Sequence, residues 1–251
     1  MAFWTLYKRE INGYFQSAVA YVVLFGSAVA QGVQFIFIVT AIVGPPAYTE
    51  QSVMQIFFVW PLFWLLLLVQ VPLITMRVFS EEFKLGTIEM LLTAPVREWD
   101  IVLAKFFGAL SFFLILWLPI ALDLFALQLF SNPEPPIYWS QIGMTALTVT
   151  LLGGFYVSLG VFTSVLTKNQ IVAAVLCFAL VFAAFGVSLL RWIQHVDANV
   201  LAWVSYVSTP EHLQNAVVGI FDTRPIVFYV TVTAFMLVLT KSILEGRRLR
   251  A

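Results

Sequence analysis

Charged residues are scarce in this chain of 251 residues, since Asp, Glu, Lys and Arg make up 10% of it and hydrophobic residues make up 61%. An ordinary soluble domain carries about 25% charged residues. A soluble fold of this composition would expose large apolar patches to water, whereas a lipid bilayer solvates such patches. The scarcity of charge therefore favours a membrane protein. The formal net charge is zero, so bulk charge gives no indication of a nucleic-acid partner.

Three further absences limit the chemistry of the chain. Its one cysteine, Cys177, can form no internal disulfide. The sequence has no Gly-x-x-x-x-Gly-Lys-Ser/Thr phosphate loop, so we expect no ATPase activity and no bound cofactor in this chain. His195 and His212 are far apart and have no cysteine companion, so we predict no metal site.

Long hydrophobic runs, by contrast, recur along the whole chain. A helix needs about 20 mostly apolar residues to cross the hydrocarbon of a bilayer. Six stretches meet this requirement, and the sequence therefore predicts an all-α polytopic membrane protein in a single domain, 1–251. The predicted spans are residues 18–43, 54–78, 102–130, 142–167, 170–190 and 226–243.

Basic residues are distributed unevenly between the two ends of these spans. If the N-terminus is cytoplasmic, all but two of the thirteen Lys and Arg residues lie in cytoplasmic segments, and only Arg191 and Arg224 lie outside. Positive charge is generally retained on the cytoplasmic side of a membrane. We therefore predict that both termini are cytoplasmic.

Two segments outside the spans have helical patterns. Residues 1–17 carry an aromatic and apolar stripe with charged residues beside it, which predicts an amphipathic helix in the inner interface; a frayed tail is the alternative. Residues 191–225 are too long for a plain turn, and they predict short helices that lie in or re-enter the outer interface.

Residues 79–101 form the longest and most charged cytoplasmic segment. Gly86 is expected to break the helix that leaves the second span, and Thr87 to Thr93 to form a short helix that ends before Pro95. That helix would present Glu89 beside apolar residues, a surface suited to docking into a partner's groove. A solvated loop resting on the headgroups fits the same residues.

This segment resembles the first cytoplasmic loop of type-2 ABC exporter permeases, most closely those associated with gliding motility. The resemblance rests on Glu81-Glu82-x-x-x-Gly86-Thr87-x-Glu89-x-Leu91-Leu92-x-x-Pro95, then Ile101-Val102-Leu103-Ala104-Lys105, and later Leu166-Thr167-Lys168-Asn169-Gln170-Ile171. In that family the loop is the coupling helix that contacts the nucleotide-binding subunit. The resemblance implies a role in ATPase coupling for Glu81, Glu82, Gly86, Thr87, Glu89, Leu91, Leu92, Pro95, Lys168 and Asn169.

The resemblance also implies partners and a location. Such a permease pairs with a second copy or a homologous subunit in the bacterial inner membrane. Two cytoplasmic ATPase subunits, which bind ATP and Mg, drive export or mechanical work. A large extracytoplasmic accessory protein is expected in the gliding-motility branch. The alternatives are a non-transporting scaffold of a motility or envelope complex and a secondary transporter driven without ATP.

A few polar residues lie inside the predicted spans. Gln31, Gln34 and Gln70 either bond to neighbouring helices or line a translocation path. Asp123 is the one acidic residue well inside a span, and it is a further candidate for that path. Gly154 with Ser158, and Gly160 with Ser164, form small-x-x-x-small pairs that predict close helix packing.

Overall fold

The computed structural model describes residues 2–43, 53–93, 96–130, 138–192 and 197–248 of the chain. These residues fold into helices joined by short connections, and no strand occurs among them. Six of the helical stretches are long and apolar enough to cross a membrane. The prediction of an all-α protein with six membrane spans is thereby confirmed.

The described helices have the following bounds, in chain order. They are α1 (Ala2–Phe15), α2 (Ala18–Val43), α3 (Val53–Val59), α4 (Pro61–Thr75), α5 (Ser80–Leu85), α6 (Thr87–Thr93), α7 (Glu98–Leu116), α8 (Leu118–Phe130), α9 (Trp139–Leu166), α10 (Gln170–Gly186), the 3-10 helix η2 (Val187–Trp192), α11 (Ala198–Val207), α12 (Thr209–Val217) and α13 (Thr223–Arg248).

Prolines divide two of the hydrophobic stretches. Trp60 is extended, with φ −66° and ψ 147°, and Pro61 opens α4, because the residue before a proline disfavours the helical conformation. The predicted stretch 54–78 is thus divided into α3 and α4. The third stretch is interrupted at Trp117, two residues before Pro119, where α7 ends and α8 begins.

The central helix of the bundle is α9, which packs against α4, α7, α10, α12 and α13. Two glycines allow its neighbours to approach. A Cβ atom at Gly153 would overlap the Phe113 ring of α7, and one at Gly160 would overlap the Thr75 side chain of α4. The predicted close approach therefore occurs at Gly160. At the other predicted pair, by contrast, Gly154 has room for a Cβ atom, and the tight contact lies one residue earlier.

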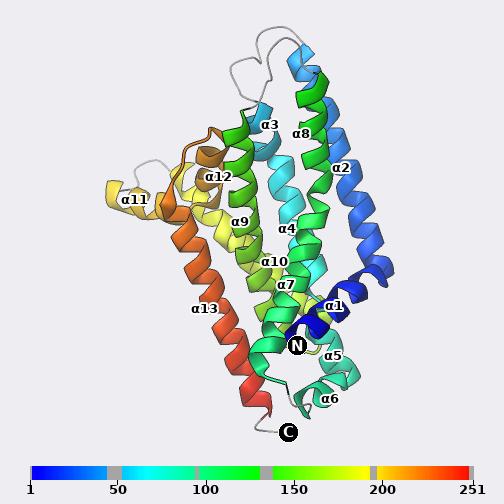
Figure 1. Ribbon diagram of the computed structural model, residues 1–251. Coiled ribbons are helices and arrows are strands. Elements are labelled where there is room, and N and C mark those ends of the chain that lie inside the picture. The colour runs from blue at the N-terminus through cyan, green and yellow to red at the C-terminus, as the bar shows by residue number, and fades with distance from the viewer. Residues whose placement is uncertain (1, 44–52, 94–95, 131–137, 193–196, 249–251) are drawn as a thin grey trace.

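Both ends of the described chain lie at one end of the bundle. Figure 1 shows α1, α5, α6 and the last turns of α13 gathered there, and α11 and α12 lie toward the other end. We call the first the basic end, because Lys8, Arg9, Lys84, Arg247 and Arg248 lie on these helices. The α1 helix lies across α7, where a Cβ atom at Gly108 would come within 3.0 Å of Glu10 Cβ.

Substitution of Gly160 by Ala is expected to destabilise the bundle, because the added methyl group must displace Thr75 from its contact with α9. Overpacking of this kind costs about 2 kcal/mol. Gly143 is the matched control, since it lies in the same helix and a Cβ atom there meets nothing within 4 Å. Thermal unfolding of the purified protein in detergent should show a lower midpoint for Gly160→Ala and no decrease for Gly143→Ala. Equal midpoints for the two variants would contradict this account.

Candidate functional site

The segment that the sequence marks for coupling is a pair of short helices at the basic end. The helix α5 ends at Gly86, whose φ of 72° lies in the left-handed region that glycine adopts readily. The helix α6 follows over Thr87–Thr93. We call residues 79–93 the α5–α6 segment. It lies beyond the end of α4, at the end of the bundle where Figure 1 also draws the last turns of α13.

The first turn of α5 is bonded to the central helix. The Ser164 hydroxyl of α9 accepts hydrogen bonds from the backbone N–H groups of Phe79 (2.9 Å) and Ser80 (3.1 Å). These are among the donors that a helix N-terminus leaves without partners in the helix itself. The Ser80 hydroxyl donates to the Met76 carbonyl. The start of α5 is therefore held in place against α9.

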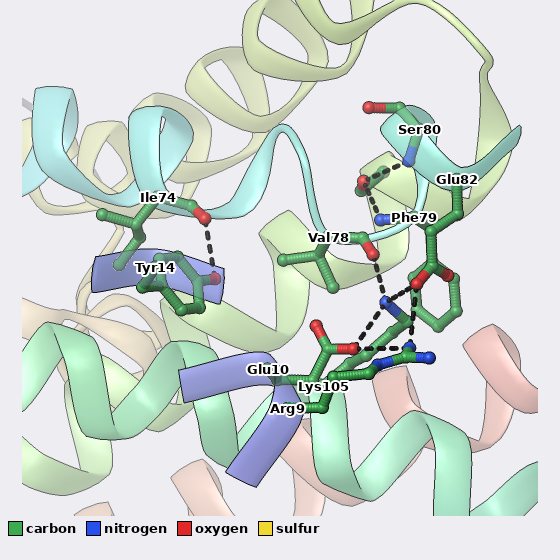
Figure 2. Close-up of polar contacts among 10 residues, drawn as sticks. Arg9, Glu10, Tyr14, Ile74, Val78, Phe79, Ser80, Glu82 and Lys105 are labelled. Atoms are coloured by element: carbon green, nitrogen blue, oxygen red, sulfur yellow. Dashed lines mark hydrogen bonds and ion pairs between the residues drawn. The ribbon is translucent and has the colours of Figure 1, made fainter. Parts of the chain in front are cut away.

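A buried lysine then joins α5 to two other helices. Lys105 of α7 is only 2% exposed. Its Nζ atom lies 3.2 Å from Glu10 Oε1 of α1 and 3.0 Å from Glu82 Oε1 of α5. It also donates to the Val78 carbonyl at 2.7 Å. Figure 2 shows these groups converging on the ammonium from different segments of the chain.

Arg9 completes this arrangement, because its Nη2 atom lies 3.0 Å from Glu10 Oε1 and 3.1 Å from Glu82 Oε1. We call Arg9, Glu10, Glu82 and Lys105 the four-charge cluster. Its two cations and two carboxylates balance, which offsets the cost of burying the lysine. The Phe79 ring adds a cation–π contact, with its centroid 5.1 Å from Lys105 Nζ.

The α1 helix is bonded to the spans at two further points. The Tyr14 hydroxyl donates to the Ile74 carbonyl of α4 at 2.9 Å, and its ring stacks on Phe112 of α7. Burial, with a smaller contribution from the charge of Glu10, raises the pKa of Tyr14 well above its usual value. The phenol therefore stays protonated and keeps its role as a donor.

The last turn of α13 lies against the other side of α5. The Arg247 guanidinium stacks over the Phe83 ring at 4.2 Å and donates to the Leu166 carbonyl at 3.1 Å. Arg248 forms an ion pair with Glu98. The α9–α10 turn, with Lys168 and Asn169, therefore lies close to the α5–α6 segment. Both residues are exposed, and the Asn169 side-chain oxygen Oδ1 accepts a hydrogen bond from the Ile171 N–H.

The residues predicted for coupling are divided between two environments. Glu82 belongs to the four-charge cluster, whereas its neighbour Glu81 is 3.4 Å from Arg77 and more exposed. Gly86, Thr87 and Glu89 are exposed at the end of the bundle. Leu91 and Leu92 lie in α6, but their side chains are outside the described part, and Pro95 is outside the described residues altogether. Met90 adds apolar surface, being 71% exposed.

Sequence reasoning did not single out Arg9, Glu10 or Ser164 as site residues, and it included Lys105 only as part of a matching run. One signal could have identified Lys105, namely a single cation inside an otherwise apolar stretch of α7, since such a charge requires partners. The partners themselves come from other helices, and no spacing in the sequence indicates them.

The three glutamines of the spans bond between helices. The Nε2 atoms of Gln31, Gln34 and Gln70 donate to the Leu116 carbonyl of α7 (2.8 Å), the Phe57 carbonyl of α3 (2.5 Å) and the Ser27 hydroxyl of α2 (2.8 Å). All three side chains are buried. The glutamines thus bond to neighbouring helices, which was one of the two alternatives that the sequence left open. A role in a translocation path stays a prediction.

The remaining candidate for the translocation path, Asp123, lies in α8. Its side chain is half-buried, and among the described residues its Oδ2 atom has no hydrogen-bond partner. A role for this carboxylate in translocation also stays a prediction.

A comparison with protein families gives a match to the family described as "ABC-2 family transporter protein", over residues 72–250. The chain belongs to this ABC-2 family. The match begins near the end of α4 and takes in the α5–α6 segment and every later span, whereas α1 and α2 precede it. No curated protein matches the chain. Proteins of the ABC-2 permease type are the transmembrane, non-catalytic components of ABC transporters, so this ABC-2 protein is a multi-pass membrane component.

A second polar group joins α12 to α13 and α9 in this ABC-2 protein. The His212 Nδ1 atom of α12 is 3.1 Å from the Tyr229 hydroxyl of α13, and the Tyr156 hydroxyl of α9 is 2.9 Å from Thr209 Oγ1. Burial lowers the pKa of His212, and the charge of Asp222 acts against that shift. His195, the other histidine, lies outside the described residues.

The buried position of His212 predicts a loss of stability in acid. The unfolded chain takes up a proton at this residue below about pH 6.5, whereas the folded protein resists it, so folding weakens as the pH falls below that value. The thermal midpoint should decrease from about pH 7.5 to about pH 5.5, and it should decrease less in His212→Gln. An identical decrease in both proteins would show that other groups cause the effect.

Replacement of Lys105 by Met should destabilise the basic end, because Glu10 and Glu82 then lose the buried one of their two shared cations. Breaking a buried ion pair from one side costs about 3–5 kcal/mol. Lys84→Met is the control, since Lys84 lies on α5 but is exposed. The thermal midpoint of Lys105→Met should be well below that of the control, and adding Glu82→Gln should recover part of the loss. A double variant that is simply additive would argue against a direct interaction.

Proposed function

We propose that this ABC-2 protein is the permease subunit of an ATP-driven exporter, and that a separate cytoplasmic ATPase docks on its α5–α6 segment. The basic end faces the cytoplasm in this proposal, since basic residues are retained there. Both termini are then cytoplasmic, and the membrane is the bacterial inner membrane. Membership in the gliding-motility branch stays a prediction from the sequence resemblance.

The observation that carries this proposal is the contrast between the two faces of the α5–α6 segment. Toward the bundle, Ser80, Phe83 and Ile88 are buried. Away from it, Leu85, Thr87, Glu89 and Met90 are exposed. A face that combines a carboxylate with apolar side chains suits a partner's groove. Such a face at the end of a membrane bundle fits an ATPase contact.

The four-charge cluster supplies a route from that contact into the spans. A partner that displaces α5 also displaces Glu82, and with it the ammonium of Lys105 in α7 and the carboxylate of Glu10 in α1. Ser164 transmits the same displacement to α9. A ligand-dependent change in the ATPase thus shifts the equilibrium between two arrangements of the spans. A coupling mechanism requires such a shift.

The partners follow from this role. Two ATPase subunits hold the ATP and Mg, because the sequence of this chain has no phosphate loop. A second permease copy or homologous subunit completes the transport unit, and a large extracytoplasmic protein receives the cargo or the mechanical work. Transport by the complex in liposomes separates this function from that of a scaffold, which would bind the ATPase without moving cargo.

Reversal of the charge at Glu89 is expected to weaken ATPase docking by about tenfold, the effect of losing one central interface contact. The experiment coexpresses the chain with the ATPase encoded beside it, measures copurification, and measures ATP hydrolysis in vesicles. Gln16→Lys is the control, because it adds a cation to an exposed position at the same end. Glu89→Lys should reduce both signals, and Gln16→Lys should leave them unchanged.

Two results would contradict the proposal. The first is failure of the unaltered chain to copurify with the ATPase. The second is an ATPase that binds and is stimulated equally by the unaltered chain and by Glu89→Lys, since docking would then lie elsewhere.

A further inference from the structure

A cavity of about 270 Å³ lies beside the four-charge cluster, between α1, α2, α4 and α7. Its walls are of two kinds. Val19, Ala20 and Val23 of α2, with Leu73 of α4, form an apolar side. The rest of the lining includes the four-charge cluster together with Arg77 and Glu81. The cavity therefore suits an amphipathic ligand.

The position of the cavity indicates where this ligand comes from. Its apolar wall belongs to two membrane spans, and its charged wall includes α1, an amphipathic helix at the end of the bundle. The boundary between such a helix and the spans is the level at which acyl chains meet headgroups. A phospholipid matches both walls, because its acyl chains are apolar and its headgroup is charged.

The charged side chains that line the cavity indicate which kind of lipid headgroup fits it. The three positive charges of Arg9, Lys105 and Arg77 equal in number the three negative charges of Glu10, Glu82 and Glu81. The wall therefore has no net charge. Within the four-charge cluster each cation is already paired with both carboxylates. The remaining pair is Arg77 with Glu81, separated by 3.4 Å, and these side chains are 34% and 40% exposed.

Arg77 and Glu81 can each meet one part of a dipolar headgroup. One guanidinium nitrogen of Arg77, Nη1, donates to Ser17 at 2.7 Å, and Nε lies 3.4 Å from Glu81. The Nη2 group is left to donate to a phosphate. The Glu81 carboxylate can accept hydrogen bonds from a primary ammonium. A choline headgroup has no N–H to donate, and an anionic glycerol headgroup brings no cation to Glu81.

We propose that this cavity binds one phospholipid with a zwitterionic, primary-ammonium headgroup, namely phosphatidylethanolamine. The phosphate lies against Arg77, the ammonium against Glu81, and the first part of an acyl chain against Val19 and Val23. A lipid in this place contacts α1, α2 and the start of the α5–α6 segment together, and so stabilises their arrangement. The site does not depend on ATPase docking.

Native mass spectrometry of the detergent-purified chain tests this site, with equal amounts of phosphatidylethanolamine, phosphatidylcholine and phosphatidylglycerol. The expected result is one bound phosphatidylethanolamine, retained about tenfold over the other two, the effect of one charge-assisted hydrogen bond. Glu81→Gln should abolish the preference over phosphatidylcholine, because the neutral amide is a weaker partner for an ammonium. Equal retention of the three lipids, or an unchanged preference in Glu81→Gln, would overturn the proposal.

A second pair of variants tests the apolar wall. Val19→Trp fills the cavity and should remove the bound lipid, whereas Val22→Trp lies on the same helix at a position that is 71% exposed and outside the cavity. Lipid retention by Val19→Trp equal to that of Val22→Trp would place the lipid elsewhere and overturn the proposal. If Val19→Trp does not fold, the Glu81→Gln result decides. No ATPase is present in these measurements, so they are independent of the proposed coupling.

Discussion

The ammonium of Lys105 joins three segments that are distant in sequence. It contacts Glu10 in α1, Glu82 in α5 and the carbonyl of Val78 between α4 and α5. Without its partners this buried charge would carry a large desolvation cost, so α1, α5 and α7 must come together for the basic end to fold. The position of the α5–α6 segment depends on that requirement.

This constraint gives the segment two different sides. Its inner side is bonded through the four-charge cluster, through Ser164 and through the stacking of Arg247 on Phe83. Its outer side exposes Leu85, Glu89 and Met90. A partner on the outer side meets an element that is already connected to α1, α7, α9 and α13, so a small displacement reaches several helices at once.

The spans are held together by a different set of interactions. Lipid is as apolar as the helices, so apolar contact alone drives little association, and close packing and interhelical hydrogen bonds take its place. Gly153 and Gly160 supply the close packing on α9, and the three glutamines supply bonds from side-chain amides to other helices. Charge pairing thus organises the basic end, and packing with uncharged polar bonds organises the spans.

The sequence alone determined those features that depend on local chemistry. Six apolar stretches must be helical and must lie in a bilayer, Gly86 must interrupt a helix, and residues 87–93 follow as a short helix, because hydrophobic length and backbone preference act over neighbouring residues. Glu81 and Glu82, in contrast, are chemically identical neighbours, and only the tertiary structure decided that one contacts buried Lys105 while the other faces Arg77. Likewise Gly153 and not Gly154 meets Phe113. Adjacent positions on a helix face different directions. Which of the two residues meets a partner therefore depends on where the whole fold places the neighbouring helices.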